Sequence, residues 1–302
     1  MPRPTLYVCC PAYALRGPAH TATVLRAAEQ LAQARGWQVV PGPSLFYYPG
    51  PGAWAPAPAR RAELVAALQH HYLWACRGGY GCLPLLPDVL TLDPPGPPPV
   101  LLGFSDVTVL HAAWLKRGWG PSYYARLGDD PGQGRVAESL LPLLDGQALT
   151  RSNTSDPMAR ALRPGQAQGP LFAACLAVLA GLCGTPAQPD LRGRILALED
   201  IDERAYRVDF FLEQLFQSGA LTGIRGLIGG SFLHQNEPEY QGPTHDEVLT
   251  AWAQRLAIPA ISRLPFGHLA DALTLPNGRQ TTLDVAPDDW RLAFHKDNPE
   301  AR

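Results

Sequence analysis

The sequence predicts an α/β protein in two parts, a parallel sheet covered by helices and a smaller part rich in strands. Two observations carry this prediction. Apolar strand and helix patterns alternate through the N-terminal half, whereas short strands separated by Pro and Gly dominate the C-terminal end. The chain has 302 residues, of which 46% are hydrophobic, so it is long enough for two domains with packed cores.

The N-terminal half is expected to hold four buried strands with helices between them. The strands are predicted at 5–10, 37–40, 72–76 and 100–104, and the helices at 20–35, 60–69 and 107–116. In a parallel sheet, ligands bind beyond the carboxyl ends of the strands. The glycine-rich turn 77–81 and Ser105 follow the third and fourth strands, so both are expected at that edge.

The C-terminal half has a mixed pattern. Helices are predicted at 171–182, 205–218 and 245–256, and strands at 193–198, 223–230 and 259–264. The turn signal Pro276-Asn277-Gly278 predicts a hairpin formed by 273–275 and 281–283. A change of composition places the first domain at 1–150, a linker at 151–166 and the second domain at 167–302.

Composition excludes several classes of protein. The formal net charge is -2 and no basic stripe is present, which argues against a nucleic-acid partner. No apolar stretch approaches the ~20 residues of a membrane span. The six cysteines lack C-x-x-C spacing, which favours buried free thiols over a metal site and suits a reducing, cytoplasmic compartment. The apolar run 6–15 loosely resembles a signal peptide, but Pro11 interrupts it, so a buried strand is the preferred interpretation.

The turn Gly103-Phe104-Ser105-Asp106 is the first candidate for chemistry. A serine between a strand and a helix is exposed as a nucleophile, and helix N-terminal N–H groups beside it can hold a developing oxyanion. The familiar motif is G-x-S-x-G, and Val107 replaces its second glycine here. The alternative is that Ser105 or Asp106 only caps the following helix.

A serine nucleophile needs a base, and the base needs an acid that orients it. His268 follows Gly267 in a loop between strands, where it is either such a base or an ordinary surface residue. Glu199 and Asp200 end an apolar strand, where one of them either reaches the sheet edge or caps the helix that begins near residue 202. These residues taken singly leave both interpretations open.

Four segments carry a resemblance that spans nearly the whole chain. They are R-G-G-Y-G at 77–81, G-F-S-D-V-T at 103–108, L-A-L-E-D-I-D-E at 196–203, and F-G-H at 266–268 followed by T-L-P-N-G at 274–278. In this order they resemble the LD-carboxypeptidase family, serine peptidases that remove D-alanine from the murein tetrapeptide. The resemblance implies a flavodoxin-like parallel-sheet N-terminal domain, a smaller β-rich α+β C-terminal domain and a homodimer.

The resemblance also implies roles for individual residues. Ser105 matches the family nucleophile, Glu199 the acid and His268 the general base, with the site between the domains. The backbone N–H groups of Asp106 and Gly79 are then the expected oxyanion donors. The implied reaction is release of the terminal D-alanine through an acyl-enzyme in peptidoglycan recycling, with no metal and no cofactor expected.

Three features leave questions for the structure. Ala173-Ala174-Cys175 stands where family members tend to have Gly-Gly-Asn, which predicts an altered loop near the site. The proline-rich loop 41–58, with its aromatic residues, either shapes the substrate entrance or packs as a surface loop. Arg77 is available for the carboxylate of the substrate or for a structural salt bridge.

Two other functions fit the same residues. One is an immunity-type peptidase of the same family that cleaves peptidyl-nucleotides such as processed microcin C, which the aromatic residues at 46–54 leave open. The other is a non-catalytic protein that holds a small peptide in its cleft.

Overall fold

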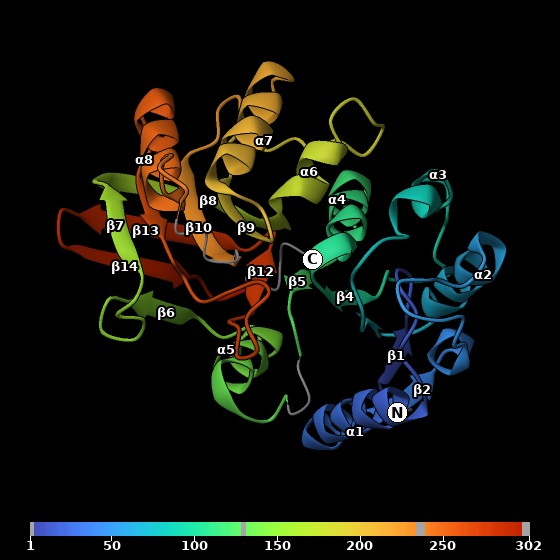
Figure 1. Cartoon of the computed structure of the whole chain (residues 1–302). Helices are drawn as coiled ribbons and strands as arrows, with labels where there is room; N and C mark the ends of the chain where they lie inside the picture. The colour runs from blue at the N-terminus through green and yellow to red at the C-terminus, as the bar shows by residue number, and fades with distance from the viewer. Residues whose placement is uncertain (1–2, 128–130, 234–238, 298–302) are drawn as a thin grey trace.

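The computed structural model describes residues 3–127, 131–233 and 239–297. Two sheets stand side by side, each with helices packed on it (Figure 1). None of the helices in these ranges combines the length and apolarity needed to cross a bilayer.

The first sheet has the strand order β12-β5-β4-β3-β1-β2. Its strands are β1 (Thr5–Cys9), β2 (Gln38–Pro41), β3 (Tyr72–Ala75), β4 (Val100–Gly103), β5 (Ser122–Tyr124) and β12 (Leu275–Asn277). Strands β1 to β5 pair in parallel, and their order 2-1-3-4-5 is that of flavodoxin-like folds. The predicted parallel sheet is therefore confirmed.

Helices cover both faces of this sheet because alternate strand residues point to opposite sides. Leu6 and Val8 of β1 pack in the same apolar cluster as α1 (Pro18–Arg35) and α5 (Gly134–Leu144). Tyr7 and Cys9 pack with the helices of the other face. These are α2 (Ala57–Ala67), α3 (Leu86–Val89) and α4 (Thr108–Arg117), with 3-10 turns at η1 (Pro43–Phe46), η2 (Leu83–Leu85) and η3 (Ser105–Val107).

The second sheet has eight strands in the order β6-β14-β13-β8-β9-β10-β11-β7. They are β6 (Leu149–Ser152), β7 (Arg160–Arg163), β8 (Gly165–Cys175), β9 (Ile195–Ile201), β10 (Gly226–Leu233), β11 (Ala260–Ser262), β13 (Gln280–Ala286) and β14 (Asp289–Phe294). Strands β8 to β11 are parallel to one another, and the remaining pairs are antiparallel. The helices of this half are α6 (Leu176–Gly181), α7 (Ala205–Gln217) and α8 (His245–Leu256).

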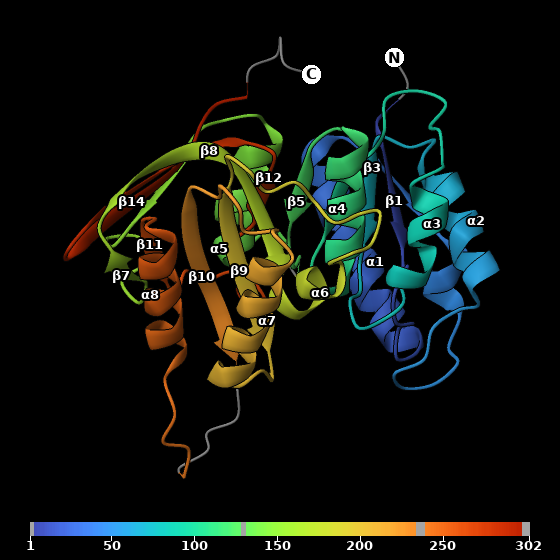
Figure 2. The same cartoon turned by 90° about the horizontal axis from the view of Figure 1, so that it is seen from above.

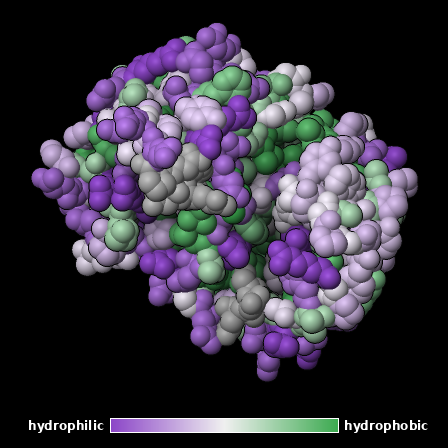
Figure 3. All heavy atoms as spheres, in the orientation of Figure 1, coloured by the Kyte–Doolittle hydropathy of each residue, from purple (hydrophilic) through white to green (hydrophobic). Residues whose placement is uncertain are grey.

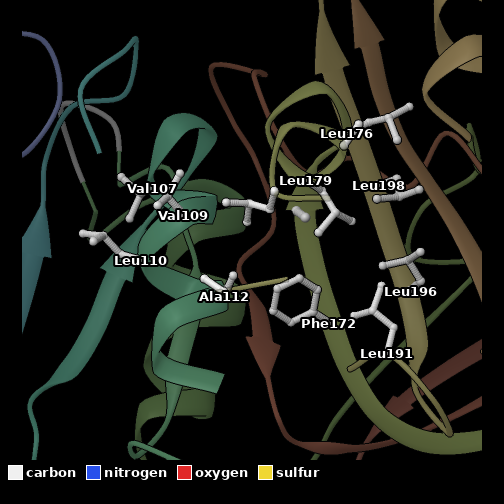
Figure 4. Close-up of a cluster of buried hydrophobic side chains, with 14 of the residues drawn as sticks. Val107, Val109, Leu110, Ala112, Phe172, Leu176, Leu179, Leu191, Leu196 and Leu198 are labelled. Atoms are coloured by element: carbon white, nitrogen blue, oxygen red, sulfur yellow. The ribbon is translucent and has the colours of Figure 1, made fainter. Parts of the chain in front are cut away.

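The two halves share their apolar packing, because each of the two buried clusters contains residues of both halves. In Figure 2, α4 of the first half and α6 of the second lie next to each other where the two halves meet. Figure 4 shows Val109 and Ala112 of α4 facing Leu179 of α6 and Phe172 of β8, and all four are buried in the same cluster. This shared core holds the carboxyl ends of β4 and β9 in a fixed relation.

Three predictions about the second half differ from the structure. The run 171–182 was predicted to be a single helix, but 171–175 ends strand β8 and only 176–181 is helical. Short apolar runs do not distinguish a buried strand from a helix, which explains the error. The stretch 151–166, predicted as a linker, holds β7 and the ends of β6 and β8.

The predicted hairpin at 273–283 is also wrong. Strand β12 pairs with β5 of the first sheet, whereas β13 pairs with β8 and β14 of the second. The turn signal Pro276-Asn277-Gly278 marks where the chain reverses. This turn signal does not determine which strands the two flanking segments pair with.

Candidate active site

Ser105 lies at the carboxyl end of β4, as predicted, and begins the 3-10 turn that leads into α4. Its φ is +61°, a left-handed conformation that is strained for a non-glycine residue and is enriched at functional sites. Its backbone N–H donates to the Tyr124 hydroxyl at 2.9 Å. The capping alternative is wrong, because no side chain caps the N-terminus of η3 or of α4.

His268 joins Ser105 to the second sheet. It follows β11, its side chain is only 13% exposed, and its Nε2 lies 3.0 Å from the Ser105 Oγ. Its Nδ1 lies 2.7 Å from Oε2 of Glu199. Because a carboxylate can only accept, Nδ1 carries the proton and Nε2 remains an acceptor for the serine hydroxyl.

Glu199 lies near the carboxyl end of β9 and is fully buried. Its Oε2 accepts from both Nδ1 and the backbone N–H of His268, the latter at 3.1 Å, and its Oε1 accepts from the Tyr124 hydroxyl at 2.5 Å. A Cβ at Gly267, whose φ is +103°, would lie 2.2 Å from Oε2. The glycine of F-G-H therefore lets the backbone approach the carboxylate, and the side chain that was considered as a helix cap binds the imidazole instead.

Tyr124 is a residue of this site that the sequence analysis missed. It is the last residue of β5, and its buried hydroxyl accepts from the Ser105 amide and donates to Glu199. Burial, reinforced by the Glu199 charge, raises the pKa of this phenol far above its usual range. No motif marks it, because a three-residue strand carries almost no periodicity.

Asp200 is buried beside Glu199 but binds other groups. Its carboxylate accepts from the backbone N–H groups of Ala177 at 2.8 Å and Ile201 at 2.9 Å. Burial is the main cause that raises its pKa to about 6. Neighbouring strand residues point to opposite faces, so Glu199 alone meets His268.

The expected oxyanion donors, the amides of Asp106 and Gly79, belong to segments next to Ser105 in the chain and in space. Asp106 follows Ser105, and its buried side chain accepts from the Cys82 N–H at 2.8 Å, which ties the end of the 77–81 turn to the segment that carries Ser105. Gly78, the residue before Gly79, directly abuts Ser105. A Cβ on Gly78 would lie 2.9 Å from Oγ and 3.5 Å from the Asp106 nitrogen, whereas a Cβ on Gly79 would overlap the Tyr13 ring at 2.2 Å.

Ala173, Ala174 and Cys175 do not form the altered loop that was expected. They end strand β8 and pair with β9, where Cys175 lies opposite Glu199. The Cys175 N–H donates to the Thr108 hydroxyl of α4 at 3.0 Å. The stretch therefore helps to join the two halves beside the site.

The surface is hollowed where the two halves meet (Figure 3). A hydroxyl bonded to an imidazole, which is in turn bonded to a buried carboxylate, is an arrangement that activates serine nucleophiles. Among the described residues, no group of three or more His, Cys, Asp or Glu side chains could hold a metal ion. The structure thus brings the three residues that the resemblance singled out within hydrogen-bonding reach of one another.

Comparison with known proteins identifies the family. The LD-carboxypeptidase N-terminal domain matches residues 6–125, and the LD-carboxypeptidase C-terminal domain matches residues 168–283. A carboxypeptidase-family protein of Streptomyces coelicolor is 36% identical over 69% of this chain and 67% of its own length. The chain belongs to the LD-carboxypeptidase family. It is a serine-type carboxypeptidase.

Other LD-carboxypeptidase relatives and solved structures agree with the fold. The murein tetrapeptide carboxypeptidase of Pseudomonas aeruginosa is 29% identical over 70% of this chain and 72% of its own length. The muramoyltetrapeptide carboxypeptidase of Oxalobacter formigenes has a TM-score of 0.78 at 27% identity, covering 97% of this chain and 100% of that one. The microcin C7 self-immunity protein, solved with aspartyl sulfamoyl adenosine, has a TM-score of 0.75 at 20% identity over 97% of this chain and 96% of its own, and shows a shared fold.

Proposed function

We propose that this LD-carboxypeptidase releases the terminal D-alanine of a murein tetrapeptide in peptidoglycan recycling, using Ser105, His268 and Glu199. One observation carries the proposal. The Ser105 Oγ lies 3.0 Å from Nε2 of His268, and Nδ1 of the same ring lies 2.7 Å from Glu199. Similarity to proteins named for murein tetrapeptide and muramoyltetrapeptide supports the substrate.

In the proposed reaction His268 takes the hydroxyl proton as Ser105 attacks the carbonyl before the terminal D-alanine. Glu199 holds the ring in the tautomer that leaves Nε2 free to accept, and it stabilises the imidazolium that forms. His268 then gives its proton to the departing amine of D-alanine. Water, activated by the same imidazole, hydrolyses the acyl-enzyme and restores the serine.

The Asp106 amide is the first proposed donor to the oxyanion, because it follows the nucleophile at the start of the turn. The Gly79 amide is the second proposed donor, and its neighbour Gly78 lies against Ser105. An absent side chain at Gly78 leaves space beside both Oγ and the Asp106 nitrogen for the developing charge. Removing one donor of this kind typically lowers the rate by ~10²–10³-fold.

Arg77 is the proposed partner of the substrate's terminal carboxylate. It lies two residues beyond the end of β3 and directly before the Gly78–Gly79 turn, and its Nε is buried with no hydrogen-bond partner among the described residues. The structural salt bridge considered from the sequence is not among the ion pairs of the described residues. Arg77 precedes Gly78, which abuts Ser105, and an unpartnered guanidinium N–H suits a carboxylate ligand. We also propose that the enzyme is cytoplasmic and forms a homodimer, as the family resemblance implies.

Incubation with defined muropeptides, read by mass spectrometry, tests the proposed function. The wild-type enzyme is expected to release D-alanine from L-Ala-D-Glu-meso-diaminopimelate-D-Ala. Ser105→Ala is expected to lower that rate at least 10⁴-fold without loss of fold, because the nucleophile is gone. Chelators are expected to leave the rate unchanged. Full turnover by the variant would remove the nucleophile assignment, and inhibition reversed by zinc would indicate a metallopeptidase.

A peptidyl-nucleotide remains the second candidate substrate. The observation that favours it is a set of exposed aromatic side chains in loop 41–58, which could stack on a base. Comparing hydrolysis of the two substrate types with the wild-type enzyme separates the candidates.

A further inference from the structure

Three aromatic side chains gather beside the 77–81 turn and form what we call the aromatic platform: Tyr13, Trp54 and Tyr80. The Tyr13 and Trp54 rings are stacked at 5.8 Å with an interplanar angle of 8°, and Tyr80 meets Trp54 edge-on at 5.1 Å. Trp54 is 39% exposed and Tyr80 42% exposed. The rings come from three different loops, so their meeting at the surface is a product of the fold.

Arg60 of α2 holds those three loops together. It is only 2% exposed, and its guanidinium donates to the carbonyls of Ala55 and Pro11, each at 2.7 Å, and to that of Gly81. Each carbonyl lies one or two residues from a ring of the platform. A buried cation bonded to three loops fixes the backbone on which the rings stand, so the platform is preorganised.

The platform is continuous with the candidate active site. The Tyr13 N–H donates to the Gly78 carbonyl at 3.3 Å, and the Tyr13 ring lies directly against Gly79. Gly78 in turn abuts Ser105. Since neighbouring Cα atoms are about 3.8 Å apart, the exposed rings stand on the order of 10 Å from the Ser105 hydroxyl, about three extended residues.

We propose that the aromatic platform binds the pyranose ring of a muramyl peptide. This inference rests on the proposed function. A tetrapeptide of L-Ala, D-Glu, diaminopimelate and D-Ala has no ring of its own, and three residues separate its scissile carbonyl from the sugar. The sugar is the part of such a substrate with an apolar C–H face, which aromatic side chains bind by packing. An adenine would also stack, but the self-immunity protein shares only the fold, so a base is an outcome of the test.

The test compares kcat/KM for the free tetrapeptide with kcat/KM for the same peptide carrying N-acetylmuramic acid at its N-terminus. The wild-type enzyme is expected to prefer the glycosylated peptide, and Trp54→Ala is expected to reduce that preference about tenfold. Trp54→Phe should restore part of it because a ring remains. Phe46→Ala is the matched control: it removes another exposed aromatic ring of the same loop, 55% exposed, outside the platform.

If Trp54→Ala lowers kcat/KM equally for both peptides, or leaves the ratio of the two kcat/KM values unchanged, the platform proposal is wrong. A Trp54→Ala defect confined to a peptidyl-nucleotide would also overturn it and would assign the rings to a base. Binding of both peptides to Ser105→Ala by calorimetry separates this result from a failure of the proposed function. Suppose instead that the wild-type enzyme cleaves neither peptide while the Trp54 side chain still increases affinity for the peptide that carries the sugar. That result would support the platform proposal and contradict the proposed function.

Discussion

The edge of the first sheet and the edge of the second hold their reactive groups by different means. At the first, the backbone fixes Ser105, through a φ of +61° and the close approach of Gly78. At the second, hydrogen bonds fix Glu199, which accepts from His268 and from Tyr124. Substitutions at the first edge should therefore act through added volume, and those at the second through a lost hydrogen bond.

Among substitutions that leave the Ser105 hydroxyl in place, the largest effect is expected at the second edge. Glu199→Gln should lower kcat about 10³–10⁴-fold, because an amide no longer stabilises the imidazolium and can favour the wrong tautomer; a comparable change in chymotrypsin-type proteases lowers kcat about 10⁴-fold. Steady-state kinetics on the tetrapeptide measures this. Glu203→Gln is the control, since Glu203 pairs with Arg207 and makes no contact with the site. If Glu203→Gln lowers kcat as much as Glu199→Gln does, Glu199 contributes only its negative charge and not its hydrogen bond to His268.

A smaller loss is expected when volume is added at the first edge. Gly78→Ala should lower kcat about 10²–10³-fold, because the new Cβ would lie 2.7 Å from the Ser105 Cβ and would fill the space proposed for the oxyanion. Gly96→Ala adds the same methyl group where no atom lies within 4 Å. Near-normal kcat in Gly78→Ala would contradict the proposed position of the oxyanion.

Tyr124 connects the two edges, because its hydroxyl is bonded to both Ser105 and Glu199, and its removal should have a smaller effect on kcat than either change above. Tyr124→Phe is expected to lower kcat about tenfold and to change KM by no more than about twofold. The reason is that Tyr124 positions Ser105 and Glu199 and is not proposed to bind the substrate. The acid limb of kcat/KM should move to higher pH, since a carboxylate without the phenol hydrogen bond stabilises the imidazolium more. Tyr123→Phe removes a buried hydroxyl bonded to the Leu143 carbonyl at 3.0 Å and should leave the pH profile in place.

The smallest effect on rate is expected from Asp200, which affects stability instead. Its folded pKa of about 6 exceeds the ordinary 3.8, so its contribution is most favourable below pH 4 and is lost as pH rises through 6. Asp200→Asn should gain stability relative to wild type between pH 4 and pH 7, by at most about 3 kcal/mol. Urea unfolding at both pH values measures the difference. If the difference in the free energy of unfolding between Asp200→Asn and wild type is the same at both pH values, the Asp200 carboxyl group is not protonated in the folded protein at low pH as expected.

The stability of Asp200→Asn has to be compared with that of wild type at each pH, because buried His111 also makes stability depend on pH. Burial lowers its pKa to about 4, so wild type and variant alike lose stability as pH falls below the ordinary 6.5. This slope is opposite in sign to that of Asp200. Only the difference between the two proteins isolates the carboxyl group.

The sequence predicted the parts of the molecule that carry local patterns. Alternation of strands and helices gave the first sheet, and a strand-turn-helix pattern placed Ser105 at its edge. Glu199 and His268 needed the family resemblance, because no short-range pattern relates residues so far apart in the chain. Tyr124 and the contact of Gly78 with Ser105 depend on tertiary packing, so neither could be predicted.

Strand β12 shows how firmly the two halves are interlocked. It completes the first sheet beside β5, while Asn277 at its end accepts from the Ala173 N–H of β8 at 2.6 Å and the Gly278 N–H donates to the Leu171 carbonyl at 2.8 Å. A hinge opening between the halves would have to shear these bonds. A tetrapeptide should therefore meet a catalytic centre already assembled, and a fragment truncated before residue 275 would expose a bare strand edge inviting aggregation.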